Sequence, residues 1–238
     1  MFVPIPLLCI VERLMPKRKD WLLDWKDLAE DLFWLAGTFL TWAPIYDQAY
    51  DTPISNLFES VRDASGFPFR LEAETTGGLL LAAFIAIFAA EFIGYWAHHH
   101  ITKMIVARAE RTHPLEFLGL NLGSAVALAF LGASAEVVAV VVVFRLNTVH
   151  LCHSNLPLVS GVFGWLFNTP EWHQLHHSCI YKESNTNFGS TVIIWDRLFG
   201  TFSGKNHIER VGNGTGEKLS IVTQLLIPFK SDQALREL

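Results

Sequence analysis

The sequence is poor in charged residues and has no excess of basic ones. Only 17% of its 238 residues are charged and 51% are hydrophobic, with a mean hydropathy of +0.31. This composition is too apolar for an ordinary soluble domain and predicts a membrane protein. The net charge of −5 and the pI near 6.0 leave no basic field, so we expect no nucleic-acid partner.

Cysteine is also scarce, with Cys9, Cys152 and Cys179 scattered and no CxxC pair. This excludes a disulfide framework and a cysteine-based metal site, and we expect the three to be small buried hydrophobic residues. The sequence also lacks HExxH, so a zincin protease would have no general base. At the start of the chain the basic cluster follows the apolar run, which predicts a membrane-associated segment and not a secretory signal.

Apolar runs predict most of the membrane part. Residues 32–46 form a charge-free run that fits a short span or a re-entrant helix, and 47–77 read as a polar loop with some helix. Residues 78–97 carry one charge in twenty and predict a spanning helix. Residues 117–144 are long enough for one helix or for two half-length helices that break near Gly132, and we favour a hairpin that dips into the membrane and returns.

The basic residues indicate how the predicted membrane segments are oriented in the membrane. They lie before the first apolar run and after the spanning helix, while the loop between is acidic; they are Arg13, Lys17, Arg18, Lys19, Lys26, Lys103, Arg108 and Arg111. The positive-inside rule makes both segments cytoplasmic. We therefore predict an all-α fold, an integral membrane helical bundle with a cytoplasmic histidine-rich helical cap.

The predicted division follows the same changes in composition. It comprises an N-terminal membrane-associated segment (1–30), transmembrane helices and a hairpin with the first histidine cluster (31–144), a cytoplasmic histidine-rich metal-site region (145–210) and a C-terminal tail (211–238).

Ten histidines are the main chemical signal. The stretch NTPEWHQLHHS places His173, His176 and His177 on an arc of roughly 100° if it is helical. Neutral imidazole suits iron, zinc and copper, so this arc predicts a metal site; surface or capping histidines are the alternative. His150 and His153, one helical turn apart, could each be a ligand or an interfacial histidine, and we expect His207 on the surface.

A third group, His98 to His100, follows the spanning helix. At most two consecutive helical residues can face one site, and His98 is the best candidate because it is in phase with Glu91 and Tyr95. A carboxylate this deep in an apolar helix is usually functional or paired, so Glu91 is singled out as well.

Together, several motifs resemble those of the fatty acid hydroxylase / sterol desaturase superfamily. In chain order they are EFIGYWAHH (91–99), RTHPLE (111–116), HSNL (153–156), TPEWHQLHHS (169–178) and NFGSTVIIWDRLFGTF (187–202). The resemblance implies an integral membrane enzyme with histidine boxes around a non-haem di-iron centre. Such enzymes use O2 and electrons from a reductase or a cytochrome b5-like partner to hydroxylate or desaturate a lipid.

The resemblance also implies a ligand set. The implied iron ligands are His98, His153, His173, His176 and His177, with His99 and His150 as weaker candidates. Glu91 matches a position that could orient a ligand from the second shell. Within NFGSTVIIWDRLFGTF, Asn187, Gly189 and Gly200 suit turns and Trp195 and Phe199 suit a membrane-surface anchor, so we interpret that segment as packing and turns without chemistry.

The sequence departs from the family in and after the first box. In place of the family's YWxHRxxH, His99 stands where the arginine is expected and Thr102 where the second histidine is expected. Only 12 residues, 99–110, separate His98 from Arg111, and the central HxxHH box is absent, as in a deletion. The remaining ligands could complete about one ion. Three hypotheses follow: a fatty acyl or sterol hydroxylase/desaturase; an inactive relative acting as a membrane lipid-binding or scaffold protein; and a single-zinc hydrolase with Glu91 or Glu171 as base.

Overall fold

A computed structural model describes residues 4–22, 25–101, 114–209, 211, 220–226 and 229, without the side chains of 4–6, 25, 99–101, 114–116 and 181. Within these ranges every named element is helical, and extended pairing is limited to two isolated bridges, Phe167 with Val192 and Ser178 with Val211. The predicted all-α fold class is confirmed.

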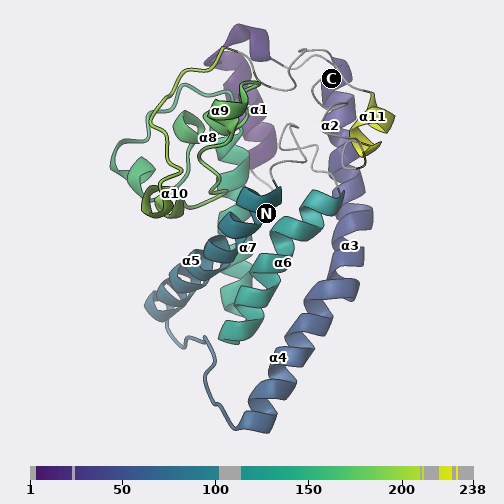
Figure 1. The fold of residues 1–238 in the computed structure, drawn as a ribbon, viewed down its shortest axis with the longest axis vertical. Coiled ribbons are helices and arrows are strands. Elements are labelled where there is room, and N and C mark those ends of the chain that lie inside the picture. Colours follow the sequence, from purple (N-terminus) through teal and green to yellow (C-terminus); the bar gives the residue numbers. More distant parts are fainter. Residues whose placement is uncertain are drawn as a thin grey trace.

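The elements run from an N-terminal helix through a long limb and three packed helices into a cap of short helices (Figure 1). Their bounds are α1 Pro4–Leu14, η1 Lys19–Trp21, α2 Trp25–Gly37, η2 Thr38–Trp42, α3 Ala43–Tyr46, η3 Asp47–Asp51, α4 Thr52–Ser65, α5 Thr76–Ile101, α6 Pro114–Leu131, α7 Ala135–Cys152, η5 Gly161–Trp165, α8 Pro170–His176, α9 Tyr181–Ser184, α10 Ile194–Phe199 and α11 Ile221–Leu226.

The long limb, α2 to α4, differs from the prediction. Residues 47–77 were expected to be a loop with some helix, but the chain stays helical without a break from Trp25 to Ser65. Two π-helical segments, η2 and η3, each end two residues before a proline, Pro44 and Pro53. A proline ring clashes with the carbonyl four residues earlier, and a wider turn accommodates it, so these prolines do not end the helix.

The predicted hairpin has its break at Gly132, which adopts the left-handed conformation with φ +58°. Backbone pairing with the 66–75 connection fixes this turn: the Leu71 N–H donates to the Leu131 carbonyl at 3.0 Å, and the Ser134 N–H donates to the Leu71 carbonyl at 3.1 Å. Helix α7 continues to Cys152, past the expected end at 144, so the predicted boundary between membrane part and cap falls inside a helix.

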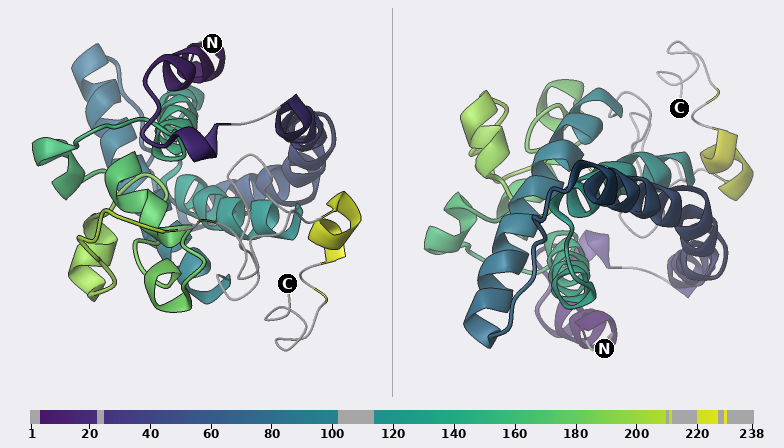
Figure 2. Two further views of the ribbon diagram at one scale, coloured as in Figure 1. Left: turned by 90° about the horizontal axis from the view of Figure 1, so that it is seen from above. Right: turned by 90° about the horizontal axis from the view of Figure 1, so that it is seen from below.

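Two helical stretches among the described residues are long and apolar enough to cross a membrane, Thr76–His98 and Ala135–Cys152, and α6 contributes the shorter apolar stretch Phe117–Leu131. Small buried residues such as Ala83 and Ala86 let α5 pack against Val137 and Val141 of α7. Seen along the long axis, the cap and the α2–α4 limb lie on opposite sides of α6 (Figure 2).

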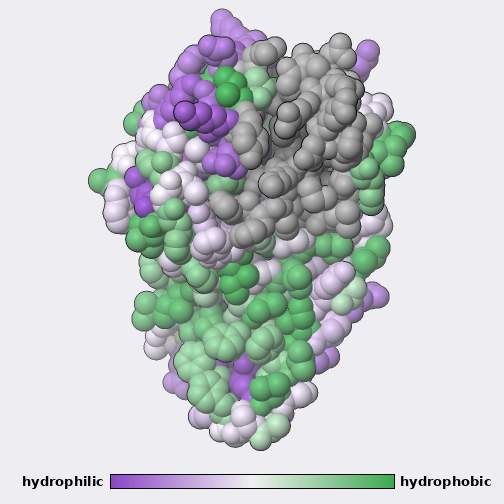
Figure 3. Space-filling model, viewed as in Figure 1, coloured by the Kyte–Doolittle hydropathy of each residue, from purple (hydrophilic) through white to green (hydrophobic). Residues whose placement is uncertain are grey.

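Large apolar side chains cover the outside of the packed helices. Exposed examples on α5 are Leu80, Leu81, Phe84 and Ile85. The lower half of the face in Figure 3 is mostly hydrophobic, while hydrophilic residues gather near its top. This distribution fits a membrane helical bundle that carries a polar cap.

Candidate metal centre

The cap brings histidines together from three elements. Helix α7 ends at Cys152 and His153 is its C-cap residue. Helix α8 begins with Pro170 in its first turn, after Thr169 in extended conformation, and ends at His176. His173 and His177, four residues apart, therefore face one side.

His153, His173 and His177 form what we term the histidine triad. Their Nε2 atoms lie 2.9 Å apart between His153 and His173, 3.0 Å between His153 and His177, and 3.1 Å between His173 and His177. Among the described residues, these three form a group whose ligand atoms could hold one metal ion.

The spacing of the triad fits a metal ion. Metal–nitrogen bonds of about 2.1 Å at right angles would separate ligand atoms by about 3.0 Å, whereas tetrahedral angles would separate them by about 3.4 Å. The observed separations are short enough for all three Nε2 atoms to contact one ion.

Hydrogen bonds at Nδ1 orient two triad rings. Nδ1 of His153 lies 2.7 Å from the Val149 carbonyl. A ring that donates from Nδ1 keeps the Nε2 lone pair for a metal. Nδ2 of Asn168 lies 2.9 Å from Nδ1 of His173, while its Oδ1 accepts the Thr169 N–H at 2.9 Å. Ligation by His173 through Nε2 needs a proton on Nδ1, so it requires the Asn168 amide to turn its oxygen towards the ring.

His98 and His176 form a second group beside the triad, which we term the histidine pair. Their ring centroids lie 4.6 Å apart, and the His176 ring lies 5.7 Å from that of His173. Nδ1 of His98 is 2.6 Å from the Phe188 carbonyl, and Nδ1 of His176 is 3.0 Å from the Thr186 carbonyl. The five primary candidates thus separate into three and two, and their role as ligands stays a prediction.

The weaker candidates are placed differently. Nδ1 of His150 lies 2.6 Å from the Leu146 carbonyl of its own helix. The His99 side chain lies outside the described residues, as do the side chain of His100 and residues 102–113, where the central box would begin. His207 is exposed, as expected.

Burial keeps the cap imidazoles neutral. Loss of hydration lowers the pKa of His153 to about 4 and that of His176 to about 3. It also lowers the pKa values of His173 and His177 well below 6.5, and the neighbouring imidazoles lower them further. Neutral rings are the form that metals bind.

The 186–189 turn holds the histidine pair, which the sequence analysis did not foresee. Asn187 has φ 54°, and the Phe188 and Gly189 N–H groups both donate to the Asp196 carboxylate at 2.8 Å. A Cβ on Gly189 would lie 2.2 Å from the Val192 carbonyl oxygen. The expected turn is present, but its carbonyls contact His98 and His176, so it serves the site. The sequence signal for this turn was the pairing of Asn187 with Gly189, two residue types that favour turns.

Glu91 is paired. Arg145 Nε donates to one carboxylate oxygen at 2.9 Å, and the Thr191 N–H donates to the other at 2.8 Å. The Thr191 carbonyl accepts the Asn168 N–H at 2.8 Å, and Asn168 contacts His173. Glu91 therefore supports His173 through two intermediaries. Neither Asn168 nor Arg145 is among the site residues expected from the sequence, although Arg145 is the lone base at the end of an apolar run.

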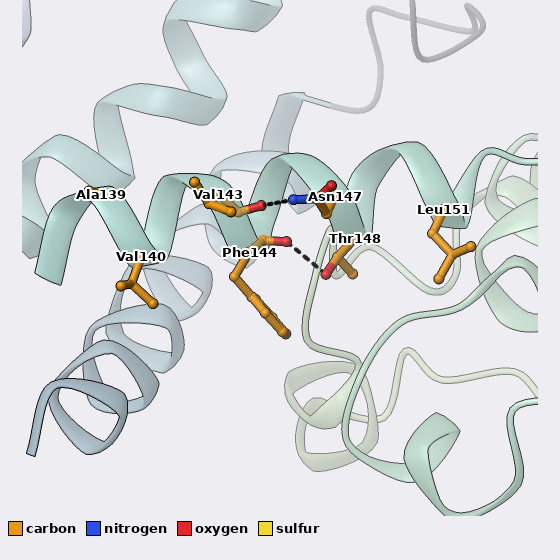
Figure 4. A pocket seen from close by; sticks show the side chains of 7 residues that line it. All are labelled: Ala139, Val140, Val143, Phe144, Asn147, Thr148 and Leu151. Carbon is orange, nitrogen blue, oxygen red and sulfur yellow. Dashed lines mark hydrogen bonds between the residues drawn. The ribbon is translucent and has the colours of Figure 1, made fainter. Parts of the chain in front are cut away.

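An apolar groove of about 550 Å³ follows one face of α7. The side chains of Val140, Phe144 and Leu151 point to the same side of the helix (Figure 4). The two polar lining residues are turned onto their own helix: Asn147 donates to the Val143 carbonyl at 2.6 Å and Thr148 to the Phe144 carbonyl at 2.9 Å. The groove therefore offers a surface for hydrocarbon.

Comparisons with known proteins agree with these features. The sequence profile of the family described as "Fatty acid hydroxylase" matches residues 94–201. An ornithine lipid hydroxylase of Rhizobium tropici is 25% identical over 94% of this chain and 73% of its own length. A putative methylsterol monooxygenase of Dictyostelium discoideum is 25% identical over 75% of this chain and 72% of its own length. An alkylglycerol monooxygenase of Xenopus tropicalis is 39% identical over 28% of this chain and 15% of its own length. No solved structure matches significantly.

Proposed function

The chain belongs to the fatty acid hydroxylase / sterol desaturase superfamily, and we propose that it hydroxylates or desaturates a membrane lipid with O2 at an iron ion held by the histidine triad. Its similarity to lipid and sterol oxygenases supports a lipid hydroxylase or desaturase kind of function. We further propose that the metal is iron, that the histidine triad binds it, and that the site faces the cytoplasm.

The observation that carries the proposal is the spacing of the triad, three Nε2 atoms within 3.1 Å of one another. Iron bound there would supply the activation of O2. His153, His173 and His177 would hold it, each through Nε2. The histidine pair would then lie beside the ion, where it could contribute to a second metal position together with further ligands.

The chain's other residues have supporting roles in this proposal. Asn168 and the Val149 carbonyl fix the rings of His173 and His153. The burial of His173 and His176, exposed by 2% and 7%, keeps bulk water from the site. The groove along α7 is the proposed seat for an alkyl chain, whose apolar surface matches its lining.

The zinc hydrolase hypothesis receives less support. It needs a free carboxylate as base, and both candidates have structural contacts: Glu91 with Arg145 and Thr191, and Glu171 with the Ser160 N–H and hydroxyl. The inactive lipid-binding relative remains the second candidate, because the central histidine box is absent from the sequence.

The proposal also includes the side of the membrane on which the triad lies and the source of the electrons. The distribution of basic residues supports a cytoplasmic face for the triad. A reductase or cytochrome b5-like partner would deliver electrons on that face, because no haem or flavin motif occurs in the sequence.

The test is a lipid conversion assay. Membranes containing the full chain, supplied with iron, O2, a reductase and NADPH, are compared by mass spectrometry with membranes containing His173→Ala or the surface control His207→Ala. We expect lipids that gain one oxygen atom or lose two hydrogens with wild type and the control, and none with His173→Ala. Wild-type membranes without such products, despite bound iron, would support the inactive lipid-binding relative instead.

A further inference from the structure

An exposed apolar surface lies on the loop that joins two triad residues, His153 and His173. We term it the apolar rim; it consists of Leu158, Val159, Val162, Phe163 and Trp165 together with Leu198 of α10. Val159 is 85% exposed, Val162 84% and Phe163 71%. Large exposed apolar side chains gathered on one loop mark an interaction surface.

The rim is held rigidly at its base. The Ser160 N–H and hydroxyl donate to Glu171 of α8 at 2.9 and 2.8 Å. Gly164 packs so closely on α8 that a Cβ there would lie 2.6 Å from Nε1 of Trp172. Arg197 donates to the Trp165 and Gly164 carbonyls, both at 2.9 Å. The apolar side chains are therefore presented outward by a fixed scaffold.

Charge is arranged around the rim as at a bilayer surface. Residues 146–170 contain no Asp, Glu, Lys or Arg. Arg197 lies at the base of the rim, with its guanidinium 5.9 Å from the centre of the Trp165 ring. An apolar loop with a tryptophan and an arginine at its base is typical of a segment at the depth where headgroups meet acyl chains.

The rim is continuous with the apolar outside of α5. Leu198 is followed by Phe199, whose ring lies 5.0 Å from Trp96 and 6.2 Å from Phe92. Trp96 and Phe92 are partly exposed near the cap end of the candidate span Thr76–His98. A membrane around that span would therefore meet the rim at its edge.

We propose that the apolar rim inserts into the lipid bilayer, at the depth where the headgroups meet the acyl chains. The rim is then a membrane contact in addition to the two candidate spans, and it seats the triad at the membrane surface from which a lipid would arrive. This proposal depends on membrane association alone and not on the proposed activity, so the two can fail independently.

Site-directed nitroxide labelling tests it in the full chain reconstituted in phosphatidylcholine and phosphatidylglycerol vesicles. Cys9 and Cys179 are replaced by Ser, the buried Cys152 is kept, and one label is placed at Val162→Cys. Matched controls carry the label at Leu81→Cys, on the exposed face of α5, and at Asn206→Cys, on the polar part of the cap. Gel filtration confirms that each variant keeps the wild-type elution volume.

Collision with O2, which concentrates in acyl chains, is compared with collision with a water-soluble nickel chelate. We expect the Val162 label to favour O2 several-fold, as at Leu81, while the Asn206 label favours the chelate. A Val162 label that behaves like the Asn206 label would overturn the proposal. Protection from both reagents would also overturn it, because a protein then covers the rim; dipolar broadening between labels would identify that protein as a second copy of the chain.

Discussion

The side-chain amide of Asn168 lies 2.9 Å from Nδ1 of His173. Asn168 is almost fully buried, and its backbone N–H donates to the Thr191 carbonyl. This backbone hydrogen bond fixes the position of Asn168. His173 therefore takes its orientation from a residue that is not itself a ligand.

Replacing Asn168 with Ala should weaken metal binding by about 10- to 100-fold, the usual effect of removing a residue that orients a ligand. Competition with a chromogenic chelator measures this. The control is Asn121→Ala, which removes an amide that donates to the Phe117 carbonyl of its own helix at 2.8 Å. Equal affinities in the two variants would show that Asn168 does not position His173.

The ion pair between Glu91 and Arg145 should stabilise the junction of the helices and the cap. Glu91 is 3% exposed, so Glu91→Ala should cost about 3–5 kcal/mol by leaving a partly buried guanidinium without its partner. The double variant Glu91→Ala/Arg145→Ala should cost less than the sum of the single ones, as measured by reversible unfolding in detergent. Strict additivity would mean that the two side chains do not interact.

Gly189→Ala should destabilise the cap by about 1–3 kcal/mol, because the new Cβ would lie 2.2 Å from a backbone oxygen that cannot yield without moving the turn. The matched control is Gly204→Ala, where the nearest atom, of the Phe202 ring, is at 3.8 Å. Thermal unfolding followed by circular dichroism compares the two. A Gly189 variant as stable as the Gly204 variant would be inconsistent with the close approach.

The metal-free protein should lose stability in acid. The folded-state pKa values of His153 and His176, about 4 and 3, lie below the ordinary value near 6.5. The unfolded chain therefore binds more protons below pH 6.5, and stability falls as the pH is lowered from 6.5 towards those values. Each such histidine contributes up to about 1.4 kcal/mol per pH unit. Unfolding in the presence of a chelator at pH 7.5 and 5.5 measures how the free energy of unfolding changes with pH. This change should be smaller in His176→Gln. A free energy of unfolding that does not depend on pH would contradict the burial of neutral imidazoles.

Local patterns predicted the elements that depend on them. The apolar run before His98 predicted helix α5, and Gly132 predicted the hairpin break because it can adopt a left-handed turn. The limb was mispredicted across 47–65, since Pro53 and the polar residues around it suggested a loop. A π-turn accommodates that proline, and its formation depends on backbone geometry that composition does not reveal.

The grouping of the histidines depended on contacts that are distant in sequence. Nδ1 of His98 lies within hydrogen-bond distance of the Phe188 carbonyl, 90 residues away in the sequence. That contact exists because Asp196 shapes the turn, so the division into triad and pair could not be predicted from the spacing of histidines. The arc HQLHHS predicted one metal-facing group of His173, His176 and His177, whereas the structure places His173 and His177 in the triad and His176 in the histidine pair.

Iron analysis of the purified chain and its variants tests the triad assignment most directly. Wild type and His207→Ala, expressed with added iron and purified in detergent, are compared with His173→Ala by mass spectrometry of the metal. Iron bound by wild type should be retained in His207→Ala and lost in His173→Ala. Iron content unaffected by His173→Ala, or a wild-type chain that binds no iron, would contradict the assignment.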